Sequence, residues 1–382
     1  MKLLMVSGDR QVSIGERGPF YSMQAEFSRH FERIDVICPR PPGTPTVSCI
    51  HERVFFHPAN SGRLAQVGYI LRKGRELVET QGHSLIVSHD YGWFYNGLGS
   101  ARLSAATGVP YLSELHHVPG HPRAADLRER FDKLVARAYV AWARSRTPAF
   151  RVVNRGEMPD LLTSWGVPQS QILVLPSLYI DFDLFHPSQP EAGEERFDQD
   201  VLFVGRMVNN KGLSAIVEAL ALLKGRGQGC RGLFVGKGEL LGWLRAKVHA
   251  MGLADAVRFI EWVKSPSDLA RIYRRSRVAV CASTCEGGPR VTVEAMACGT
   301  PVVSTPVGIM GELLEDGEAG RLCDFNAASL AEHLGVLLGD PSLRERAGAR
   351  AVEIVQRFEY KAALEVYARG LIDLAAAAGG RS

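Results

Sequence analysis

Short runs of β-branched residues alternate with longer helical runs along almost the whole chain. In the first half we predict strands at residues 2–6, 34–37, 53–56, 85–88, 110–114, 151–153 and 172–175. The helices predicted between them cover residues 22–31, 63–80, 97–107, 124–145 and 158–165. Such alternation is typical of parallel sheets with helices on both faces. The same scheme begins again at Val201, so the sequence predicts an α/β fold of two Rossmann-like domains that face each other across a cleft.

A chain of 382 residues is long enough for two domains. A polar, proline-bearing segment at residues 187–198 is predicted to link them. We therefore expect a first domain at residues 1–186 and a second at residues 199–357, followed by a helical carboxyl end at residues 358–382. Ligands of such α/β proteins bind at the carboxyl ends of the strands, which would meet in the cleft.

The composition is that of an ordinary globular protein, with 46% hydrophobic and 23% charged residues. A net charge of +4 is too small to indicate a nucleic-acid partner, and we expect none. No run approaches the roughly 18–20 apolar residues that span a bilayer. The first apolar run, residues 3–6, is followed directly by polar residues, unlike a signal peptide. Seven cysteines without a C-x-x-C pair favour a reduced, cytoplasmic protein without a zinc site.

Two glutamates, Glu286 and Glu294, lie eight positions apart between two apolar strands. Gly287 and Gly288 let the backbone turn sharply. A helix is expected at residues 289–298 because proline suits the first helical position. This unit would present free helix amides and a loop carboxylate to one place, which favours an anionic, hydroxyl-rich ligand. Taken alone, an acidic loop beside a surface glutamate explains the pattern equally well.

An arginine and a lysine, Arg206 and Lys211, lie between a predicted strand at residues 201–204 and a helical run at residues 213–223. The arginine can bind a diphosphate as a planar fork and the lysine as a point charge. Taken alone, however, the segment at residues 205–212 is better explained as a loop with two solvent-exposed cations that bind no ligand.

Together the motifs read Gly-Arg-x4-Lys-Gly at residues 205–212 and Glu-Gly-x-Pro-x4-Glu-Ala-Met-Ala-x-Gly-x-Pro-Val-Val at residues 286–303. This pattern resembles the retaining nucleotide-sugar glycosyltransferases of family 4, which have the GT-B fold. The match is almost continuous in the second half of the chain and covers the first half only in outline. The resemblance implies that the helical end at residues 358–382 crosses back onto the first domain.

The resemblance also implies a role for each charged residue of the two motifs. Arg206 and Lys211 would hold the donor diphosphate and stabilise its negative charge as it departs, with no metal ion and no cofactor. Glu286 would contact hydroxyls of the transferred sugar, and Glu294 would hold the ribose hydroxyls of the nucleotide. We therefore count Arg206, Lys211 and Glu286 as catalytic residues.

Further donor contacts are expected from the loop and helix between the two glutamates. Gly287 and Gly288 lie in the loop, and the amides of Arg290, Val291 and Thr292 would face the distal phosphate. Because Pro289 has no N–H, this amide cradle must begin at Arg290.

Three residues outside these motifs complete the predicted site. His116 ends the strand at residues 110–114, where the family usually carries a cleft histidine, so we count it as catalytic near the reacting carbon; His117 takes its place if the register slips. Gly18, or Gly15 in its place, would let the first helix approach the donor diphosphate or the acceptor. Val263 lies where backbone contacts to the base are expected.

The predicted helix at residues 124–145 has two faces. Its basic row is Arg130, Lys133, Arg137 and Arg144, and its apolar row is Leu127, Phe131, Leu134 and Ala138. Residues 121–155 contain nine Lys/Arg and three Asp/Glu, a net charge of +6. Such a helix can lie on an anionic membrane surface, which would place the protein at the inner face of the membrane. The commoner arrangement, with the apolar row in the core, is the one we expect.

The sequence therefore predicts transfer of a sugar from a nucleotide diphosphate sugar to a glycan, lipid-linked or small-molecule hydroxyl, with retained configuration. A sugar-nucleotide epimerase or hydrolase on the same scaffold, and an inactive nucleotide-sugar-binding protein, are the alternatives. An NAD-dependent oxidoreductase is disfavoured, because the glycines at 236, 238 and 242 have the wrong spacing for its phosphate loop.

Overall fold

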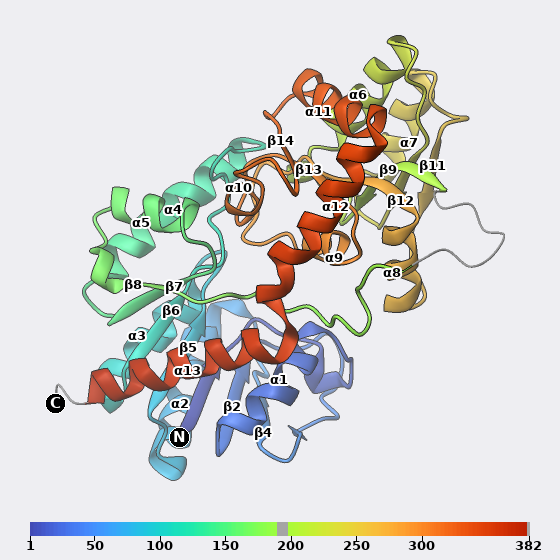
Figure 1. Cartoon of the computed structure of the whole chain (residues 1–382). Coiled ribbons are helices and arrows are strands. Elements are labelled where there is room, and N and C mark those ends of the chain that lie inside the picture. The colour runs from blue at the N-terminus through green and yellow to red at the C-terminus, as the bar shows by residue number, and fades with distance from the viewer. Residues whose placement is uncertain (189–197, 380–382) are drawn as a thin grey trace.

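The computed structural model describes residues 1–188 and 198–379. Two sheets, each covered by helices, form the two halves of the molecule (Figure 1). The α/β architecture predicted from the alternating runs is confirmed. Residues 189–197 of the predicted linker and residues 380–382 of the predicted carboxyl segment lie outside the described residues, and the predicted domain boundaries stay predictions.

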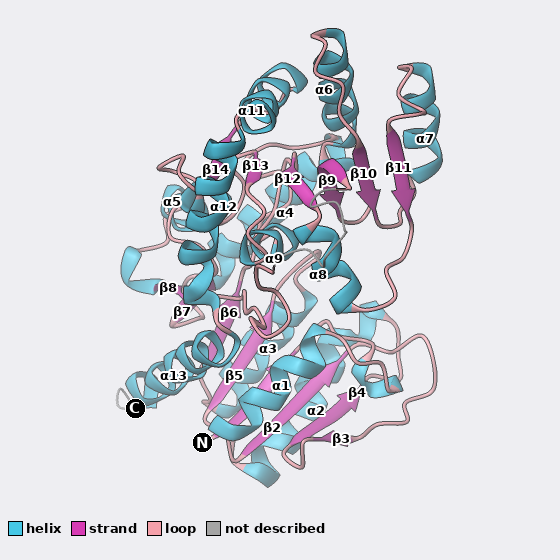
Figure 2. Ribbon diagram, turned by 45° about the vertical axis from the view of Figure 1, so that its right-hand side comes forward, coloured by secondary structure: helices cyan, strands magenta, loops and turns pink. Residues whose placement is uncertain are grey.

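The first sheet has the strand order β3-β4-β2-β1-β5-β6-β7-β8 (Figure 2). Its strands are β1 (Lys2–Val6), β2 (Arg33–Cys38), β3 (Cys49–Ile50), β4 (Val54–Pro58), β5 (Leu85–His89), β6 (Tyr111–Glu114), β7 (Ala149–Val152) and β8 (Ile172–Val174). The helices of this half are α1 (Pro19–His30), α2 (Gln66–Gln81), α3 (Tyr95–Thr107), α4 (Leu127–Ala143) and α5 (Glu157–Ser164). All these strand pairs are parallel except β3 with β4, and the short β3 was not predicted.

The second sheet is parallel and has the order β11-β10-β9-β12-β13-β14. Its strands are β9 (Gln199–Val204), β10 (Gly232–Val235), β11 (Val257–Ile260), β12 (Ser276–Cys281), β13 (Val302–Ser304) and β14 (Gly320–Leu322). Its helices are α6 (Leu213–Gly225), α7 (Leu241–Ala250), α8 (Pro266–Arg274), α9 (Arg290–Ala297), α10 (Met310–Leu313), α11 (Ala327–Gly339) and α12 (Pro341–Val355). The order changes direction between β9 and β12, so the loops after these two strands leave the same edge side by side.

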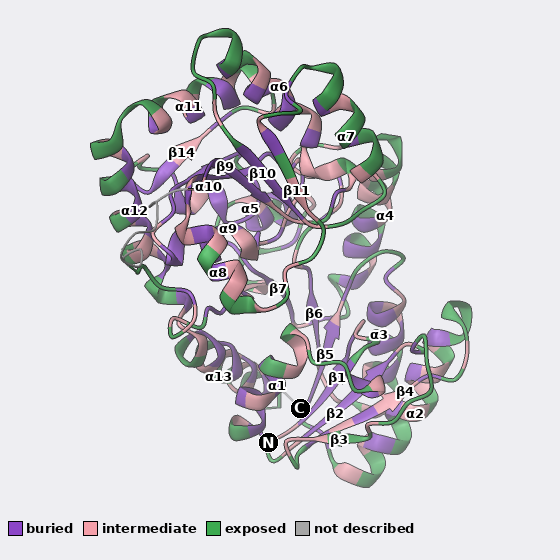
Figure 3. Ribbon diagram, turned by 90° about the vertical axis from the view of Figure 1, so that its right-hand side faces the viewer, coloured by how far each residue is buried: buried purple, intermediate pink, exposed green. Residues whose placement is uncertain are grey.

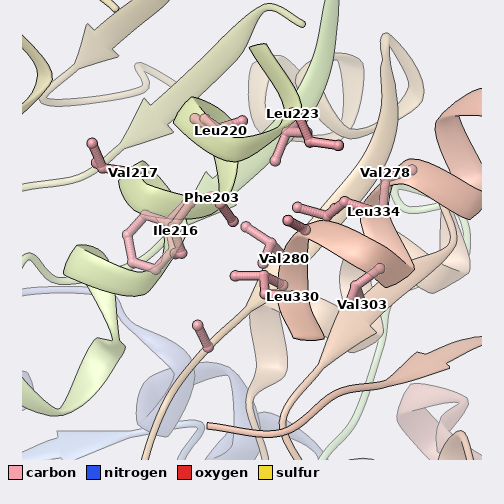
Figure 4. Packing of buried hydrophobic residues seen from close by; sticks show 14 of the residues in the cluster. Phe203, Ile216, Val217, Leu220, Leu223, Val278, Val280, Val303, Leu330 and Leu334 are labelled. Carbon is pink, nitrogen blue, oxygen red and sulfur yellow. The ribbon is translucent and has the colours of Figure 1, made fainter. Parts of the chain in front are cut away.

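The inner strands of both sheets are among the most buried parts of the molecule (Figure 3), whereas the edge strands β3, β8 and β11 are partly exposed. In the second half, α6 and α11 pack on one face of the sheet (Figure 4). Ile216 and Leu220 of α6 and Leu334 of α11 belong to one buried cluster with Val280 of β12. With Leu223 of α6 and Leu330 of α11, which belong to the same cluster, the buried residues of each helix recur every three or four positions, so the apolar stripe of each helix faces the sheet.

The last helix, α13 (Tyr360–Gly379), returns to the first half of the molecule (Figure 1). Leu364 and Leu371 are buried in the same cluster as Phe27 of α1. The crossing is held by the backbone, since Ile180 N donates to Phe358 O at 2.7 Å and Tyr360 N donates to Ile180 O at 3.0 Å. The position of α13 agrees with the return that the resemblance implies for the last helix.

Helix α4 is turned differently from our expectation. Leu127, Phe131 and Leu134, predicted to lie in the core, are 77%, 52% and 63% exposed. The core is filled instead by the opposite face of the helix, on which Tyr139 and Val140 are buried. The sequence could not decide this, because α4 carries an apolar stripe on each face.

Candidate functional site

The loop after β9 carries the two predicted cations toward the other half of the molecule. Gly205 has a φ of 156°, and a Cβ atom at Gly236 of the neighbouring loop would lie 2.0 Å from the Gly205 carbonyl oxygen. The two loops can therefore approach only with glycine there. A short 3-10 turn, η4 (Asn209–Lys211), then brings Lys211 to the start of α6, where Gly212 has the left-handed φ of 63°.

The loop after β12 brings the first glutamate to the same point. Lys211 Nζ donates a hydrogen bond to Glu286 Oε1, and Ser283 Oγ donates to the same oxygen at 2.9 Å. The side chains of Lys211 and Glu286 are only 18% and 17% exposed, so water screens their attraction weakly. The two predicted residues thus meet at the edge where the strand order changes direction.

Arg206 lies at the rim of this region. Its side chain is exposed, and the guanidinium has no hydrogen bond or ion pair within residues 1–188 and 198–379. Its charge nevertheless acts on His117 of the other half. Burial lowers the pKa of His117. The positive charges of Lys211 and Arg206 also lower it, whereas the negative charge of Glu286 raises it.

The second glutamate is held from two helices. Glu294, on α9, is 6% exposed. Its Oε1 accepts a hydrogen bond from Arg290 Nε at 2.8 Å, and its Oε2 accepts one from Tyr273 OH of α8 at 3.1 Å. Burial raises the pKa of Glu294, and Arg290 opposes that shift. A carboxylate has about four acceptor positions, so two remain for ligand hydroxyls.

Tyr179 connects the start of α1 to this pair. The Arg290 guanidinium lies 5.1 Å from the centre of the Tyr179 ring, and Tyr179 OH donates to Pro19 O at 2.7 Å. Gly18 is the N-cap of α1, and no side chain caps this end of the helix. The space beside Gly18 is open, since the nearest atom to a Cβ built there is Gln11 Oε1 at 4.0 Å. The first helix therefore begins near Arg290, on the cleft side of the molecule.

The predicted amide cradle is smaller than expected. Pro289 is the N-cap of α9 and not its first residue, because its ψ of 91° is extended. Thr292 N donates to Pro289 O at 3.0 Å, and the Thr292 hydroxyl donates to the same oxygen at 2.6 Å. Thr292 therefore cannot offer its amide to a phosphate. The amides of Arg290 and Val291 have no such acceptor in the described part of the chain.

His116 lies directly against the loop of Glu286. A Cβ atom at Gly287 would lie 2.4 Å from the His116 carbonyl oxygen, so only glycine permits this contact between the two halves. Gly288 packs beside Leu178: a Cβ atom added at Gly288 would lie 3.1 Å from the nearest side-chain atom of Leu178. The His116 side chain is 44% exposed and can reach a ligand in the cleft.

A buried ionic network behind His116 was missed by the sequence analysis. Glu114 accepts a hydrogen bond from Arg151 Nη1 at 2.9 Å and another from Tyr367 OH of α13. His89 and His116 lie 3.1 Å and 3.7 Å from the other Glu114 oxygen. Burial opposes ionisation of Glu114, but Arg151 and the two histidines outweigh it and hold the pKa well below its usual range. The one signal in the sequence was that Glu114 ends a predicted strand and His89 directly follows another.

Val263 follows β11 and packs against the buried cluster that contains Leu233 and Tyr273, the tyrosine that donates a hydrogen bond to Glu294. Within the described residues, no group of three or more histidine, cysteine or acidic side chains could hold a metal ion. All seven cysteines are free.

A cavity of about 190 Å³ lies between the two halves, on the other side of the Lys211 loop. Arg123, Asn209, Gly212, Thr284 and Phe325 line it together with neighbouring residues. Arg206, Lys211 and the two glutamates do not. This cavity is therefore a second space at the interface, next to the predicted donor site.

Comparison with known proteins decides the family. The family model described as glycosyl transferases group 1 matches residues 187–353. A D-inositol 3-phosphate glycosyltransferase 2 of Catenulispora acidiphila is 30% identical over 313 residues, covering 75% of this chain and 71% of the relative. The chain belongs to the group 1 glycosyltransferase family. The resemblance to family 4 glycosyltransferases is confirmed.

Other members of the family are matched less completely. The chain spans 65% of the D-inositol 3-phosphate glycosyltransferase of Acidothermus cellulolyticus, at 30% identity over 73% of this chain. It spans 56% of the phosphatidyl-myo-inositol mannosyltransferase of Mycobacterium leprae, at 31% identity over 55% of this chain.

Solved structures give the same fold at lower identity. Sucrose-phosphate synthase from Thermosynechococcus elongatus superposes with a TM-score of 0.80 and 21% identity, covering 98% of this chain and 99% of that one. Anabaena HepE in complex with UDP and glucose superposes with a TM-score of 0.73 and 20% identity, covering 98% of this chain and 100% of that one. The predicted GT-B fold of this group 1 glycosyltransferase is confirmed.

Proposed function

We propose that the protein transfers a sugar from a nucleotide diphosphate sugar to an acceptor hydroxyl, with retention of configuration and without a metal ion or cofactor. The observation that carries the proposal is the meeting of Lys211 and Glu286, from loops after adjacent strands, against His116 of the other half. Family membership supports the reaction class. The UDP complexes of a protein with the same fold make uracil the first base to test.

The costly step is departure of the nucleotide diphosphate, because negative charge builds up on its leaving oxygen. Lys211 and the amides of Arg290 and Val291 are in position to stabilise that charge, and Arg206 adds a long-range contribution from the rim. Before donor binding Lys211 is paired with Glu286. The donor phosphate would share the lysine, and Glu286 would then accept hydroxyls of the transferred sugar.

Glu294 would hold the ribose, since its carboxylate is fixed by Arg290 and Tyr273. His116 would contact the transferred sugar from the opposite side, with Glu114 behind it to orient the ring. Glu114 itself is unsuited to nucleophilic attack, because it is buried, its Oε1 accepts hydrogen bonds from Arg151 and Tyr367, and its Oε2 lies 3.1 Å from His89 Nε2. A same-face attack assisted by the leaving phosphate fits this arrangement and gives retention.

The acceptor would enter from the first half of the molecule and would be a glycan, a lipid-linked molecule or a small alcohol, with peripheral membrane contact in the lipid-linked case. Two measurements test the proposal. A thermal-shift panel of UDP-, GDP- and ADP-sugars identifies the donor, since selective binding raises the melting temperature. Nucleotide release is then followed with and without candidate acceptors: a transferase requires the acceptor, whereas a hydrolase releases nucleotide alone and an inactive binder releases none.

A further inference from the structure

Helix α4 carries more apolar surface than it needs to dock on the first sheet. Its inner face, with Ala136, Tyr139 and Val140, is buried. Leu127, Phe131 and Leu134 on the outer face are more than half exposed. Their spacing of four and three residues places them in one stripe along the helix. An apolar stripe directed at solvent is not explained by packing within the chain.

The loop between β5 and α3 extends this stripe. Phe94 has the left-handed φ of 56°, which is unusual for an aromatic residue, and stacks on Tyr139 at a centroid distance of 4.3 Å. This conformation turns the preceding Trp93 outward, where it is 59% exposed. The Trp93 ring lies 6.1 Å from the ring of Phe131. We call Trp93, Leu127, Phe131 and Leu134 the α4 patch.

Other large apolar side chains are exposed on other elements of the molecule. Leu222, Trp243 and Val336, for example, lie on three different helices of the second half, α6, α7 and α11. Single exposed apolar residues are normal on a protein surface, whereas a gathered patch marks an interaction site. The α4 patch is therefore the surface that calls for a partner.

The charges around the α4 patch indicate which kind of partner it binds. Residues 127–146 contain six Lys/Arg and two Asp/Glu, a net charge of +4. Arg128, Arg130 and Arg137 are exposed along the same helix. A second copy of the chain would set one such positive surface against another, which is unfavourable. A bilayer with anionic headgroups complements both the charge and the apolar stripe.

We propose that the α4 patch docks the protein on an anionic phospholipid surface. The four apolar side chains would enter the boundary between headgroups and acyl chains, and the arginines would pair with headgroup phosphates. No helix within residues 1–188 or 198–379 is long and apolar enough to cross a bilayer. The contact would therefore lie in the plane of the interface, as it does for amphipathic helices.

The patch lies beside the acceptor side of the cleft. Trp93 follows β5, whose last residue, His89, lies 6.2 Å from His116 between ring centres. Docking would hold the mouth of the cleft at the membrane surface. The inference that the acceptor is a membrane lipid or lipid-linked molecule rests on the proposed function, whereas the docking itself does not.

Vesicle flotation tests the docking with the full chain and no nucleotide. Phosphatidylcholine vesicles are compared with vesicles that also contain phosphatidylglycerol, at low and high salt. We expect binding only to the anionic vesicles and loss of binding as salt rises. The triple variant Leu127→Ser, Phe131→Ser, Leu134→Ser should lose at least tenfold in vesicle affinity. Each of Arg130→Gln and Arg137→Gln should lose about fivefold.

The matched control is Leu222→Ser with Val336→Ser, which removes exposed apolar groups from the second half and should leave vesicle binding unchanged. Because every substituted side chain is exposed, melting temperature and donor binding should also be unchanged, which shows that the variants are folded. Absence of binding to anionic vesicles overturns the proposal, as does an equal loss in the control. Self-association of the wild type that the triple variant abolishes, without vesicle binding, assigns the patch to a second copy and overturns it as well. None of these failures affects the donor-binding measurements, so the proposed function stands or falls separately.

Discussion

Lys211 Nζ donates a hydrogen bond to Glu286 Oε1, although the two residues lie 75 positions apart in the chain. The two loops that carry them leave adjacent strands, β9 and β12, where the order of the second sheet changes direction. A lysine and a glutamate that were separate elements of a sequence motif are thus one unit in the fold.

Replacing Lys211 with alanine should lower kcat by about 10²–10³-fold, because a preorganised electrostatic contact to a developing charge is worth about 3–4 kcal/mol. Steady-state kinetics with the identified donor and acceptor measure this. Lys264→Ala is the control, since Lys264 is an exposed lysine of the same half. An unchanged kcat in Lys211→Ala would remove the residue from the mechanism.

Glu294→Gln should weaken nucleotide binding about tenfold, because an amide offers fewer acceptor positions to two ribose hydroxyls than a carboxylate does. Calorimetric titration with the nucleotide measures the dissociation constant. Tyr273→Phe is the companion variant: it removes only the hydrogen bond to Glu294 Oε2 at 3.1 Å and should weaken binding much less. If both variants bind the nucleotide as the wild type does, Glu294 does not hold the ribose.

Gly287→Ala should lower turnover by about 100-fold while nucleotide affinity changes little. The added Cβ atom would lie 2.4 Å from the His116 carbonyl oxygen and would force the two halves apart. A displacement of about 1 Å is enough for a loss of this size. Gly311→Ala is the control, since no atom lies within 4 Å of a Cβ there. Equal kinetics of the two alanine variants would show that the contact with His116 is not required.

Glu157 should make stability depend on pH. Its Oε2 accepts a hydrogen bond from Gly308 N of the other half at 2.7 Å, and burial raises its pKa to about 7. An unfolded glutamate titrates near pH 4.3, so between pH of about 4.3 and 7 the folded state binds a proton that the unfolded state does not. Folding is therefore favoured as pH falls through this window, and at pH 8 the charge costs up to about 4 kcal/mol.

Glu157→Gln keeps an acceptor for Gly308 and removes that charge. We expect the variant to melt at a higher temperature than the wild type at pH 8, with a smaller difference at pH 5. Glu315→Gln, at an exposed position, should show no such dependence. A Glu157→Gln protein that is less stable than the wild type at pH 8 would contradict the assignment.

The ionic network around Glu114 should be required for stability. Arg151→Met would leave a buried carboxylate without its closest cation, and removing one partner of a buried pair typically costs about 3–5 kcal/mol. Thermal unfolding measures the effect. Arg155→Met, at an exposed arginine four positions along, should change stability little. Similar melting temperatures for the two variants would refute the structural role of Arg151.

Most of the fold could be predicted because its strands are short, apolar and bounded by polar loops. β1 occupies residues 2–6 as predicted, whereas the two-residue β3 is too short to leave a pattern. The two faces of α4 show the limit of periodicity: both rows are apolar, and only tertiary packing selects the one that is buried.

The candidate site likewise has residues that could be predicted from the sequence and residues that could not. Lys211 and Glu286 belong to motifs whose spacing is visible in the sequence. The network of Glu114, Arg151 and Tyr367 is not, because Tyr367 follows Glu114 by 253 positions and reaches it only when α13 returns to the first half. The amide of Thr292 was assigned wrongly for a local reason: the ψ of Pro289 lets the first turn of α9 close on itself.

The most direct test of the account is a crystal structure of the protein with UDP or the nucleotide that the thermal-shift panel selects. The account predicts the diphosphate within hydrogen-bonding distance of Lys211 and of the Arg290 and Val291 amides, with the ribose hydroxyls on Glu294. A nucleotide bound instead in the neighbouring cavity lined by Arg123 and Phe325, with the Lys211–Glu286 pair intact, would contradict it.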